Sequence, residues 1–304
     1  MTEYRFGLIG FPLEHSWSPR LHQAALAGLD LAGEYRLYPI PPLPEGKTAL
    51  QELLARLRTG AVGGLNVTIP HKQAVLPLLD ELTQAAREIG AVNTIFCQSG
   101  RLVGDNTDAP GFYTDLKRLT AFKELLSVDT QPAALVLGAG GSARAVVYSL
   151  QQAGWQVTIA ARRLEQAQEL AGRYQLAAAV GHTGNPVTTA IRLEQSALHS
   201  FCSINPAISL VVNTTPVGMS PEISASPWPA ELAFPQVAVV YDLVYNPAET
   251  ALVRAARAAG LQAYTGLGML VEQAALAFER WTGQIAPREM MRLAVATVGR
   301  EGPT

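Results

Sequence analysis

The sequence has little cysteine, no metal-binding spacing and no long apolar segment. Cys97 and Cys202 are its only 2 cysteines, and they lie too far apart for a CxxC pair. We therefore expect reduced thiols in a cytoplasmic protein, with no disulfide or zinc site. The 5 histidines show no HExxH or similar pattern, so we predict no metal. No apolar run approaches the ~18 residues of a membrane span, and the first residues lack a signal-peptide pattern, so we expect no membrane association.

A surplus of basic residues is also missing. The formal net charge is -2, and the 23 lysines and arginines are scattered along the chain. Proteins that bind the phosphate backbone need clustered positive charge, so we exclude nucleic acid and expect a small-molecule substrate. A chain of 304 residues exceeds what one hydrophobic core usually supports, which predicts two domains. We expect a monomer or a homodimer.

Short apolar runs alternate with helical patterns along most of the chain. RFGLIG, EYRLYPI and GGLNVTI have the composition of buried strands, and residues 48–58 have helical spacing. ALVLG, WQVTIAA, LVVNTTP and VAVVYDLVY form a second series of strands, with a helix over residues 142–153. Strands that alternate with helices of ten or more residues predict an α/β fold with mainly parallel sheets.

Domain boundaries are expected near residues 105–112 and near Gly266. Residues 1–110 would form an N-terminal α/β domain with a mainly parallel sheet, completed by helices within 266–304. Residues 111–265 would form a doubly wound, Rossmann-type domain. The polar segment 181–205 shows no clear pattern, and we assign no structure to it.

A glycine-rich motif directly follows the ALVLG strand and opens a helix, which is the context that the G-x-G-x-x-A dinucleotide fingerprint requires. Gly138 permits the tight turn, Gly140 allows close approach of a pyrophosphate, and Ala143 is small enough for the helix to pack on the strand. Free amides at the helix start favour the diphosphate. The alternative is a glycine-rich turn without a ligand. The predicted cofactor residues of this loop are Gly138, Ala139, Gly140, Gly141, Ser142 and Ala143.

The end of the next strand indicates which dinucleotide binds. An NAD site needs a carboxylate about 20 residues after the glycines, to bind the ribose hydroxyls. The sequence instead reads Ala161, Arg162, Arg163. Two guanidinium groups suit a 2'-phosphate through charge-assisted hydrogen bonds, so we predict NADP(H). The alternative is that both arginines only solvate the end of the strand.

Several polar residues of the first domain are candidates for substrate binding. Ser16 and Ser18 can point the same way in an extended segment, although Ser18 before Pro19 is also a good helix N-cap. Asn66 and Thr68 face one side of a strand.

Three further polar residues follow in the same domain. Lys72 lies in the first turn of a helix begun by Pro70, where a cation opposes the helix dipole and is unfavourable for stability. Taken alone, Lys72 is better explained as a solvated surface lysine. Asn93 and Asp108 add an amide and a carboxylate, although Asp108 can also serve only as an N-cap.

These segments occur together in one order. They are S-x-S-P, N-V-T-x-P-H-K, G-A-V-N-T, G-D-N-T-D-x-x-G-F, G-A-G-G-S-A-R, N-T-T-P-V-G-M, D-L-V-Y-N-P-x-x-T and G-x-x-M-L-V-x-Q. The series resembles the shikimate dehydrogenase family from Leu8 to about Phe278. The resemblance implies a substrate domain completed by the C-terminal helices, and a Rossmann-type NADP domain.

The resemblance also implies roles for single residues. Lys72 is implied as the catalytic acid/base, with Asp108 as its partner. The implied substrate ligands are Ser16, Ser18, Thr68, Asn93 and Gln273, with Tyr245 nearby. On the cofactor side it implies Leu243 and Gly266 near the nicotinamide, and it places Thr214 and Met219 in a matching motif. One departure is notable, because the family commonly has Asn-Arg-Thr where this chain has Ala161, Arg162 and Arg163.

The implied reaction is the reversible, NADPH-dependent reduction of 3-dehydroshikimate to shikimate, a step of chorismate and aromatic amino-acid biosynthesis. Two alternatives remain open. A quinate/shikimate dehydrogenase with relaxed use of NAD and NADP would be expected to carry an acid in place of Ala161 or Arg162. A non-catalytic NADP-sensing protein would be expected to lack Lys72 and Asp108, and both are present.

Overall fold

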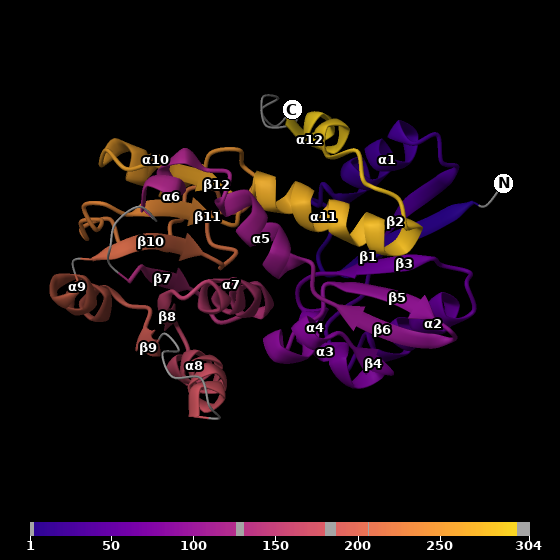
Figure 1. The fold of residues 1–304 in the computed structure, drawn as a ribbon, viewed down its shortest axis with the longest axis horizontal. Coiled ribbons are helices and arrows are strands. Elements are labelled where there is room, and N and C mark those ends of the chain that lie inside the picture. Colours follow the sequence, from indigo (N-terminus) through magenta and orange to yellow (C-terminus); the bar gives the residue numbers. More distant parts are fainter. Residues whose placement is uncertain (1–2, 126–130, 180–186, 206, 297–304) are drawn as a thin grey trace. The chain divides into compact units, whose positions relative to one another are not determined.

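The computed structural model describes residues 3–125, 131–179, 187–205 and 207–296 (Figure 1). The chain divides into two compact units. Unit 1 comprises Met1–Gly111 and Leu270–Thr304, and unit 2 comprises Phe112–Met269. The chain passes from one unit to the other within α5 (Asp108–Leu116) and again within α11 (Leu267–Thr282).

Unit 1 contains a 6-stranded sheet in the order β2-β1-β3-β5-β6-β4. Only β5 runs antiparallel to its neighbours. It forms a hairpin with β6 through Ser99 and Gly100, whose φ angles of 51° and 78° suit a tight two-residue turn. The strands are β1 (Tyr4–Gly10), β2 (Gly33–Pro39), β3 (Gly64–Val67), β4 (Glu81–Leu82), β5 (Thr94–Gln98) and β6 (Arg101–Asp105).

Helices pack on both sides of this sheet. The leucines of α2 recur at helical spacing, and Leu50, Leu54 and Leu57 are buried in one core cluster with the sheet residues Ile9, Leu65 and Ile95. Elsewhere in the unit, α1 packs against β2 and α12. The helices of unit 1, besides α5 and α11, are α1 (Ser18–Gly28), α2 (Lys47–Arg58), α3 (His71–Ala74), the 3-10 turn η1 (Leu76–Leu78), α4 (Gln84–Ile89) and α12 (Arg288–Ala296).

Unit 2 contains a second 6-stranded sheet, and every strand pair in it is parallel. Its order, β12-β11-β10-β7-β8-β9, is the Rossmann order, because the chain starts in the middle at β7, builds outward to β9 and then returns to β10. The strands are β7 (Ala133–Leu137), β8 (Gln156–Ala161), β9 (Thr188–Arg192), β10 (Ile208–Asn213), β11 (Val239–Asp242) and β12 (Ala263–Thr265).

Both faces of the second sheet are covered by helices. Along β7, Ala134 and Val136 belong to one core cluster, whereas Leu135 and Leu137 belong to another. Strands buried on both faces are apolar at nearly every position, which is why the sequence indicated them clearly. The helices of unit 2 are α6 (Thr120–Leu125), α7 (Gly141–Gln152), α8 (Leu164–Ala179), α9 (Gln195–Ile204) and α10 (Ala251–Ala258).

The predicted α/β class with two mainly parallel sheets is confirmed. Of the unassigned segment 181–205, residues 181–186 lie outside the described residues, and the remainder contains β9 and α9. Cys97 and Cys202 are free thiols. In the described part of the chain, no helix is both long and apolar enough to cross a membrane.

Candidate active site

The candidate catalytic residues of unit 1, Lys72 and Asp108, and several candidate substrate-binding residues lie at the same end of its strands. Ser16 and Ser18 follow β1, Thr68 and Lys72 follow β3, and Asp108 follows β6. Asn93 immediately precedes β5, which is the one antiparallel strand, so it lies at the same edge as the ends of the parallel strands. The strand directions therefore bring distant parts of the sequence together.

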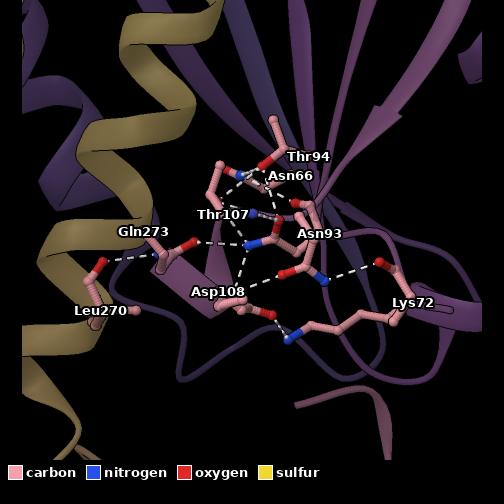
Figure 2. Close-up of polar contacts among 11 residues, drawn as sticks. Asn66, Lys72, Asn93, Thr94, Thr107, Asp108, Leu270 and Gln273 are labelled. Atoms are coloured by element: carbon pink, nitrogen blue, oxygen red, sulfur yellow. Dashed lines mark hydrogen bonds and ion pairs between the residues drawn. The ribbon is translucent and has the colours of Figure 1, made fainter. Parts of the chain in front are cut away.

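Lys72 and Asp108 form a buried ion pair at this edge (Figure 2). Lys72 Nζ donates to Asp108 Oδ2 at 2.6 Å. Lys72 is 9% exposed and Asp108 is 4% exposed, so solvent screens the pair weakly. Asn93 Nδ2 donates to the other carboxylate oxygen, Asp108 Oδ1, at 2.9 Å. The Asp108 carboxylate thus positions the Lys72 ammonium group, and the Asn93 amide positions the Asp108 carboxylate.

Asn93 is oriented by its neighbours. The backbone N–H of Thr107 donates to Asn93 Oδ1 at 2.7 Å, and the Thr94 hydroxyl donates to the same oxygen at 3.1 Å. A backbone N–H can only donate, so this contact fixes the amide oxygen toward Thr107 and turns Nδ2 toward Asp108. Thr107 and Thr94 were absent from the predicted site, although Thr107 lies within the G-D-N-T-D motif.

The four polar residues of the G-D-N-T-D motif have different roles. Asp105 and Asn106 stabilise the surrounding structure, whereas Thr107 and Asp108 belong to the site. Asp105 accepts from Thr83 Oγ1 at 2.7 Å and pairs with Arg280 at 2.8 Å. Asn106 Oδ1 accepts from the backbone N–H of Ala109 at 3.2 Å, inside the first turn of α5. Because Asn106 satisfies this helix start, the Asp108 carboxylate is available to Lys72. The alternative that Asp108 is only a cap is therefore wrong.

Asn66 lies beneath this network. Tyr35 Oη donates to Asn66 Oδ1 at 2.8 Å, and Asn66 Nδ2 donates to the Asn93 carbonyl at 3.2 Å. His22 stacks on Tyr35 with ring centroids 4.3 Å apart. Burial lowers the pKa of His22 to about 3, so the ring is neutral at physiological pH. Asn66 therefore supports the backbone beside Asn93 through protein contacts on both ends of its amide.

Ser16 lies on the loop that follows β1, Ser18 begins α1, and Thr68 lies on the loop that follows β3. The two loops are joined, because Phe11 N donates to the Ile69 carbonyl at 2.9 Å. In the structure α1 begins at Ser18 and Trp17 occupies the cap position, so Ser18 is not the N-cap. Ser16 Oγ accepts from the backbone N–H of Ser18 at 3.3 Å.

Gln273 reaches the network from α11. Asn93 Nδ2 lies 3.4 Å from Gln273 Oε1, and Gln273 Nε2 donates to the Leu270 carbonyl at 2.8 Å (Figure 2). Gly111 permits this approach, because a Cβ built on it would lie 2.9 Å from Gln273 Cβ. Tyr245, the other residue that the resemblance placed near the substrate, follows β11 and belongs to unit 2.

The predicted cofactor residues lie at the carboxyl ends of strands in unit 2, where Ala161 is the last residue of β8 and the others follow a strand. The glycine loop follows β7, the two arginines follow β8, and Thr214 and Met219 follow β10. Leu243 follows β11, and Gly266 separates β12 from α11. All strands of a parallel sheet have their carboxyl ends on the same side of the sheet. The strand order reverses between β7 and β10, and open α/β sheets bind their ligands at such a position.

The glycine loop has the conformation that its motif predicts. Gly138 has a φ of 114°, and a Cβ built there would lie 2.5 Å from Thr214 Oγ1, on the loop that follows the neighbouring strand β10. Thr214 Oγ1 in turn donates to the Leu137 carbonyl at 2.7 Å. A Cβ built on Gly140, by contrast, would meet no atom within 4 Å. Gly140 is the N-cap residue of α7, so the open space beside it lies at the start of the helix, where an anion is favoured.

A buried acid supports the ends of β10 and β11. Asp242 accepts from Asn213 Nδ2 at 2.8 Å and from Thr250 Oγ1 at 2.7 Å. Burial raises the pKa of Asp242 to about 6, and these hydrogen bonds offset part of the effect. Asn213 Oδ1 also accepts from the Thr215 hydroxyl at 2.7 Å, so the pair shapes the loop that carries Thr214.

At the end of β8, Ala161 is buried, whereas Arg162 and Arg163 are exposed. The position at the strand end therefore holds a small apolar side chain, with two guanidinium groups directly after it and no carboxylate. Among the described residues, no group of three or more His, Cys, Asp and Glu side chains is arranged to hold a metal ion.

A Rossmann-type unit with a glycine loop and a separate α/β unit with a buried lysine–aspartate pair define a two-unit, dinucleotide-binding enzyme class. Residues 8–95 match the model of the shikimate dehydrogenase substrate binding domain, and residues 266–295 match that of the shikimate 5'-dehydrogenase C-terminal domain. The NADP(+)-dependent shikimate dehydrogenase of Salinibacter ruber is 44% identical over 92% of this chain and 93% of its own. The chain belongs to the shikimate dehydrogenase family.

Solved structures agree with this assignment. The shikimate 5-dehydrogenase of Thermus thermophilus, in complex with NADP(H) and shikimate, is similar with a TM-score of 0.79 and 39% identity, covering 97% of this chain and 99% of that one. The quinate dehydrogenase of Corynebacterium glutamicum, in complex with NAD, is similar with a TM-score of 0.80 and 32% identity, covering 97% and 100% of the two chains. The fold alone is thus shared by enzymes of different substrate and cofactor.

Proposed function

We propose that this protein catalyses the reversible, NADPH-dependent reduction of 3-dehydroshikimate to shikimate. The observation that carries the proposal is the buried contact of Lys72 Nζ with Asp108 Oδ2 at 2.6 Å, in a chain 44% identical to an NADP(+)-dependent shikimate dehydrogenase. The free thiols of Cys97 and Cys202 are consistent with activity in the cytoplasm.

Unit 1, completed by the C-terminal helices, is proposed as the substrate domain. Ser16, Ser18 and Thr68 supply hydroxyl groups for the substrate's carboxylate and ring hydroxyls. Asn93 and Gln273 supply amides, and Tyr245 stays a candidate substrate ligand on the family resemblance alone. We assign Asn66 a supporting role, because both ends of its amide already bind protein groups.

Unit 2 is proposed as the NADP domain. The open space at Gly140, at the start of α7, suits a diphosphate, and Arg162 and Arg163 suit a 2'-phosphate. The absence of a carboxylate at Ala161 disfavours NAD, which argues against the quinate alternative. Met219, Leu243 and Gly266 would border the nicotinamide half at the same edge of the sheet.

Lys72 acts as the acid in ketone reduction. When bound, NADPH supplies the hydride that reduces the ring carbonyl of the substrate. The Lys72 ammonium group donates a proton to the oxygen on which negative charge develops, and in the reverse direction the neutral amine accepts it. Asp108 holds Nζ in place and stabilises its positive charge, while Asn93 prevents the carboxylate from rotating away.

An assay of both substrates with both cofactors tests the proposal. We expect NADPH formation with shikimate and NADP, and a much lower kcat/KM with quinate or with NAD. Faster turnover of quinate with NAD would favour the quinate dehydrogenase alternative. Failure to oxidise either substrate, in protein that still binds NADP, would favour the sensing alternative.

A further inference from the structure

The edge strand β9 of the second sheet ends in a further arginine, Arg192, in addition to Arg162 and Arg163, which the sequence predicted as cofactor residues. Arg192 is the last residue of β9, and it pairs in register with Ala161, the last residue of β8. The two strand ends are joined, because Leu193 N donates to the Ala161 carbonyl at 2.9 Å. Arg192 therefore lies beside the turn that carries Arg162 and Arg163.

The side chain of Arg192 is directed toward this turn. Its Nη1 lies 3.4 Å from the Arg162 carbonyl oxygen, at the limit of a hydrogen bond. Ala190, two positions earlier on β9, packs against the core cluster that contains Ala161. Because side chains alternate along a strand, Arg192 points to the same face of the sheet as Ala161.

Three arginines thus lie at two neighbouring strand ends. Arg162, Arg163 and Arg192 are all exposed, and within the described residues none of them forms an ion pair with a carboxylate. Two acids lie close in sequence, Glu165 in the first turn of α8 and Glu194 after β9, and Glu194 Oε1 accepts from the Ser196 hydroxyl at 3.3 Å. A bound dianion would offset the surplus positive charge of the three arginines.

We propose that Arg192 is a specificity-determining residue that binds the 2'-phosphate of NADP together with Arg162 and Arg163. This inference rests on the proposed use of NADP and extends it to a residue outside the glycine and arginine motifs. The start of α8 at Leu164 follows the same turn, so the positive end of its dipole favours the same charge. A third guanidinium group at the 2'-phosphate increases the affinity for NADP relative to that for NAD.

Binding of two adenosine nucleotides isolates the contribution of the phosphate. The nucleotide 2',5'-ADP carries the 2'-phosphate and 5'-AMP lacks it, and calorimetric titration of the full chain measures both affinities. Arg192→Ala should weaken 2',5'-ADP binding about 5- to 20-fold, at the lower end for a charge-assisted hydrogen bond because the group is exposed. Binding of 5'-AMP should stay unchanged, and Arg192→Lys should recover part of the loss.

Arg254→Ala is the matched control. Arg254 is an exposed arginine on α10, which packs against β11 and β12 at the opposite edge of the sheet, so its replacement should alter neither affinity. If Arg162→Ala weakens 2',5'-ADP binding but Arg192→Ala and Arg192→Gln leave it within twofold, the role of Arg192 is wrong and the NADP assignment stands. If the unaltered protein binds 2',5'-ADP no more tightly than 5'-AMP, the NADP assignment itself fails.

Discussion

At the scale of single residues, the Asp108 carboxylate organises the candidate active site. One oxygen accepts from Lys72 Nζ and the other from Asn93 Nδ2, so the carboxylate has a fixed orientation. A buried charge that lost its partner would be left uncompensated, at a cost of several kcal/mol. Substitutions here therefore need a measure of folding beside the measure of activity.

Lys72→Ala should lower kcat for shikimate oxidation by ~10²–10⁴-fold, because the group that exchanges a proton with the substrate oxygen is removed. The affinity for NADP should change little, since Lys72 belongs to unit 1 and the proposed cofactor residues belong to unit 2. Steady-state kinetics with titration of NADP measures both quantities.

Lys47→Ala is the control for this substitution. Lys47 is an exposed lysine at the start of α2 in the same unit, and its replacement should leave kcat within twofold of the unaltered protein. A Lys72→Ala protein that folds and retains kcat within a few-fold would contradict the assignment of Lys72 as the acid.

The sequence predicted the reacting residues better than the residues that orient them. Lys72, Asn93 and Asp108 stand in recognisable motifs, and the structure brings all three together. The orienting role of Thr107 depends on its backbone N–H meeting Asn93 Oδ1, which is a matter of loop geometry. The support of Asn66 by Tyr35 joins separate strands, and no local pattern encodes it.

At the scale of elements, the loop between β7 and α7 combines a structural glycine with a ligand-facing one. Gly138 needs its positive φ and has no room for a Cβ beside Thr214. Gly140 has an ordinary φ of -82° and open space around it. The two glycines are therefore needed for different reasons, although both belong to the same motif.

Alanine substitution should separate the two roles. Gly140→Ala should leave the melting temperature nearly unchanged and weaken NADP binding at least tenfold, because the new methyl group occupies the space proposed for the diphosphate. Gly138→Ala should weaken binding and also destabilise the fold by about 1–3 kcal/mol, because of backbone strain and the clash with Thr214. Thermal unfolding and calorimetric titration measure the two effects.

Gly154→Ala is the control for strain alone. Gly154 has a φ of 84° after α7, and a Cβ built there would meet no atom within 4 Å. This variant should lose stability and retain NADP affinity. If Gly140→Ala bound NADP as tightly as the unaltered protein, the diphosphate would not lie against this loop.

Three of the strands that the sequence missed lie at the edges of sheets. β4 has only two residues, β12 has three, and both are edge strands. β9 is an edge strand with two threonines and an arginine, and its exposure removes the apolar signal on which strand prediction depends. The antiparallel β5 lies inside its sheet and was missed as well, although it forms a local hairpin with β6.

At the scale of the whole molecule, each unit contains a buried titratable group with a shifted pKa, and the two shifts act on stability in opposite directions. In unit 1, burial lowers the pKa of His22 to about 3 from 6.5. In unit 2, burial raises the pKa of Asp242 to about 6 from 3.8. Acidification should therefore affect the units differently.

His22→Phe should gain stability relative to the unaltered protein as the pH falls from 6.5 to 4. Between these values the unfolded chain protonates His22 and the native protein does not, so acidification destabilises only the protein that has the histidine. The relative gain should reach about 3 kcal/mol, with the effect constant above pH 6.5. Phenylalanine preserves the stacking on Tyr35, and urea unfolding across this range measures the difference.

Asp242→Asn provides the matched contrast, because its stability relative to the unaltered protein should change with pH in the opposite direction. Between pH 6 and pH 4 the native protein binds a proton at Asp242 more tightly than the unfolded chain does, so acidification stabilises the unaltered protein through this group. The variant should lose this gain on acidification, and above pH 6 the difference should be constant. Equal pH slopes for both variants and the unaltered protein would contradict these two shifts.

The sequence by itself determined the α/β class, the apolar strands of the Rossmann-type sheet, the glycine loop and the residues proposed for catalysis. These features are local, because a buried strand, a φ-positive glycine or a motif is written in consecutive residues. Only the tertiary structure decided that Thr107 orients Asn93, that Asn106 relieves Asp108 of capping, and that Arg192 lies beside Ala161. The Thr107–Asn93 and Arg192–Ala161 contacts depend on which strand ends lie side by side, and strand order is set by packing of the whole unit. The Asn106 contact is local, but it depends on where α5 begins.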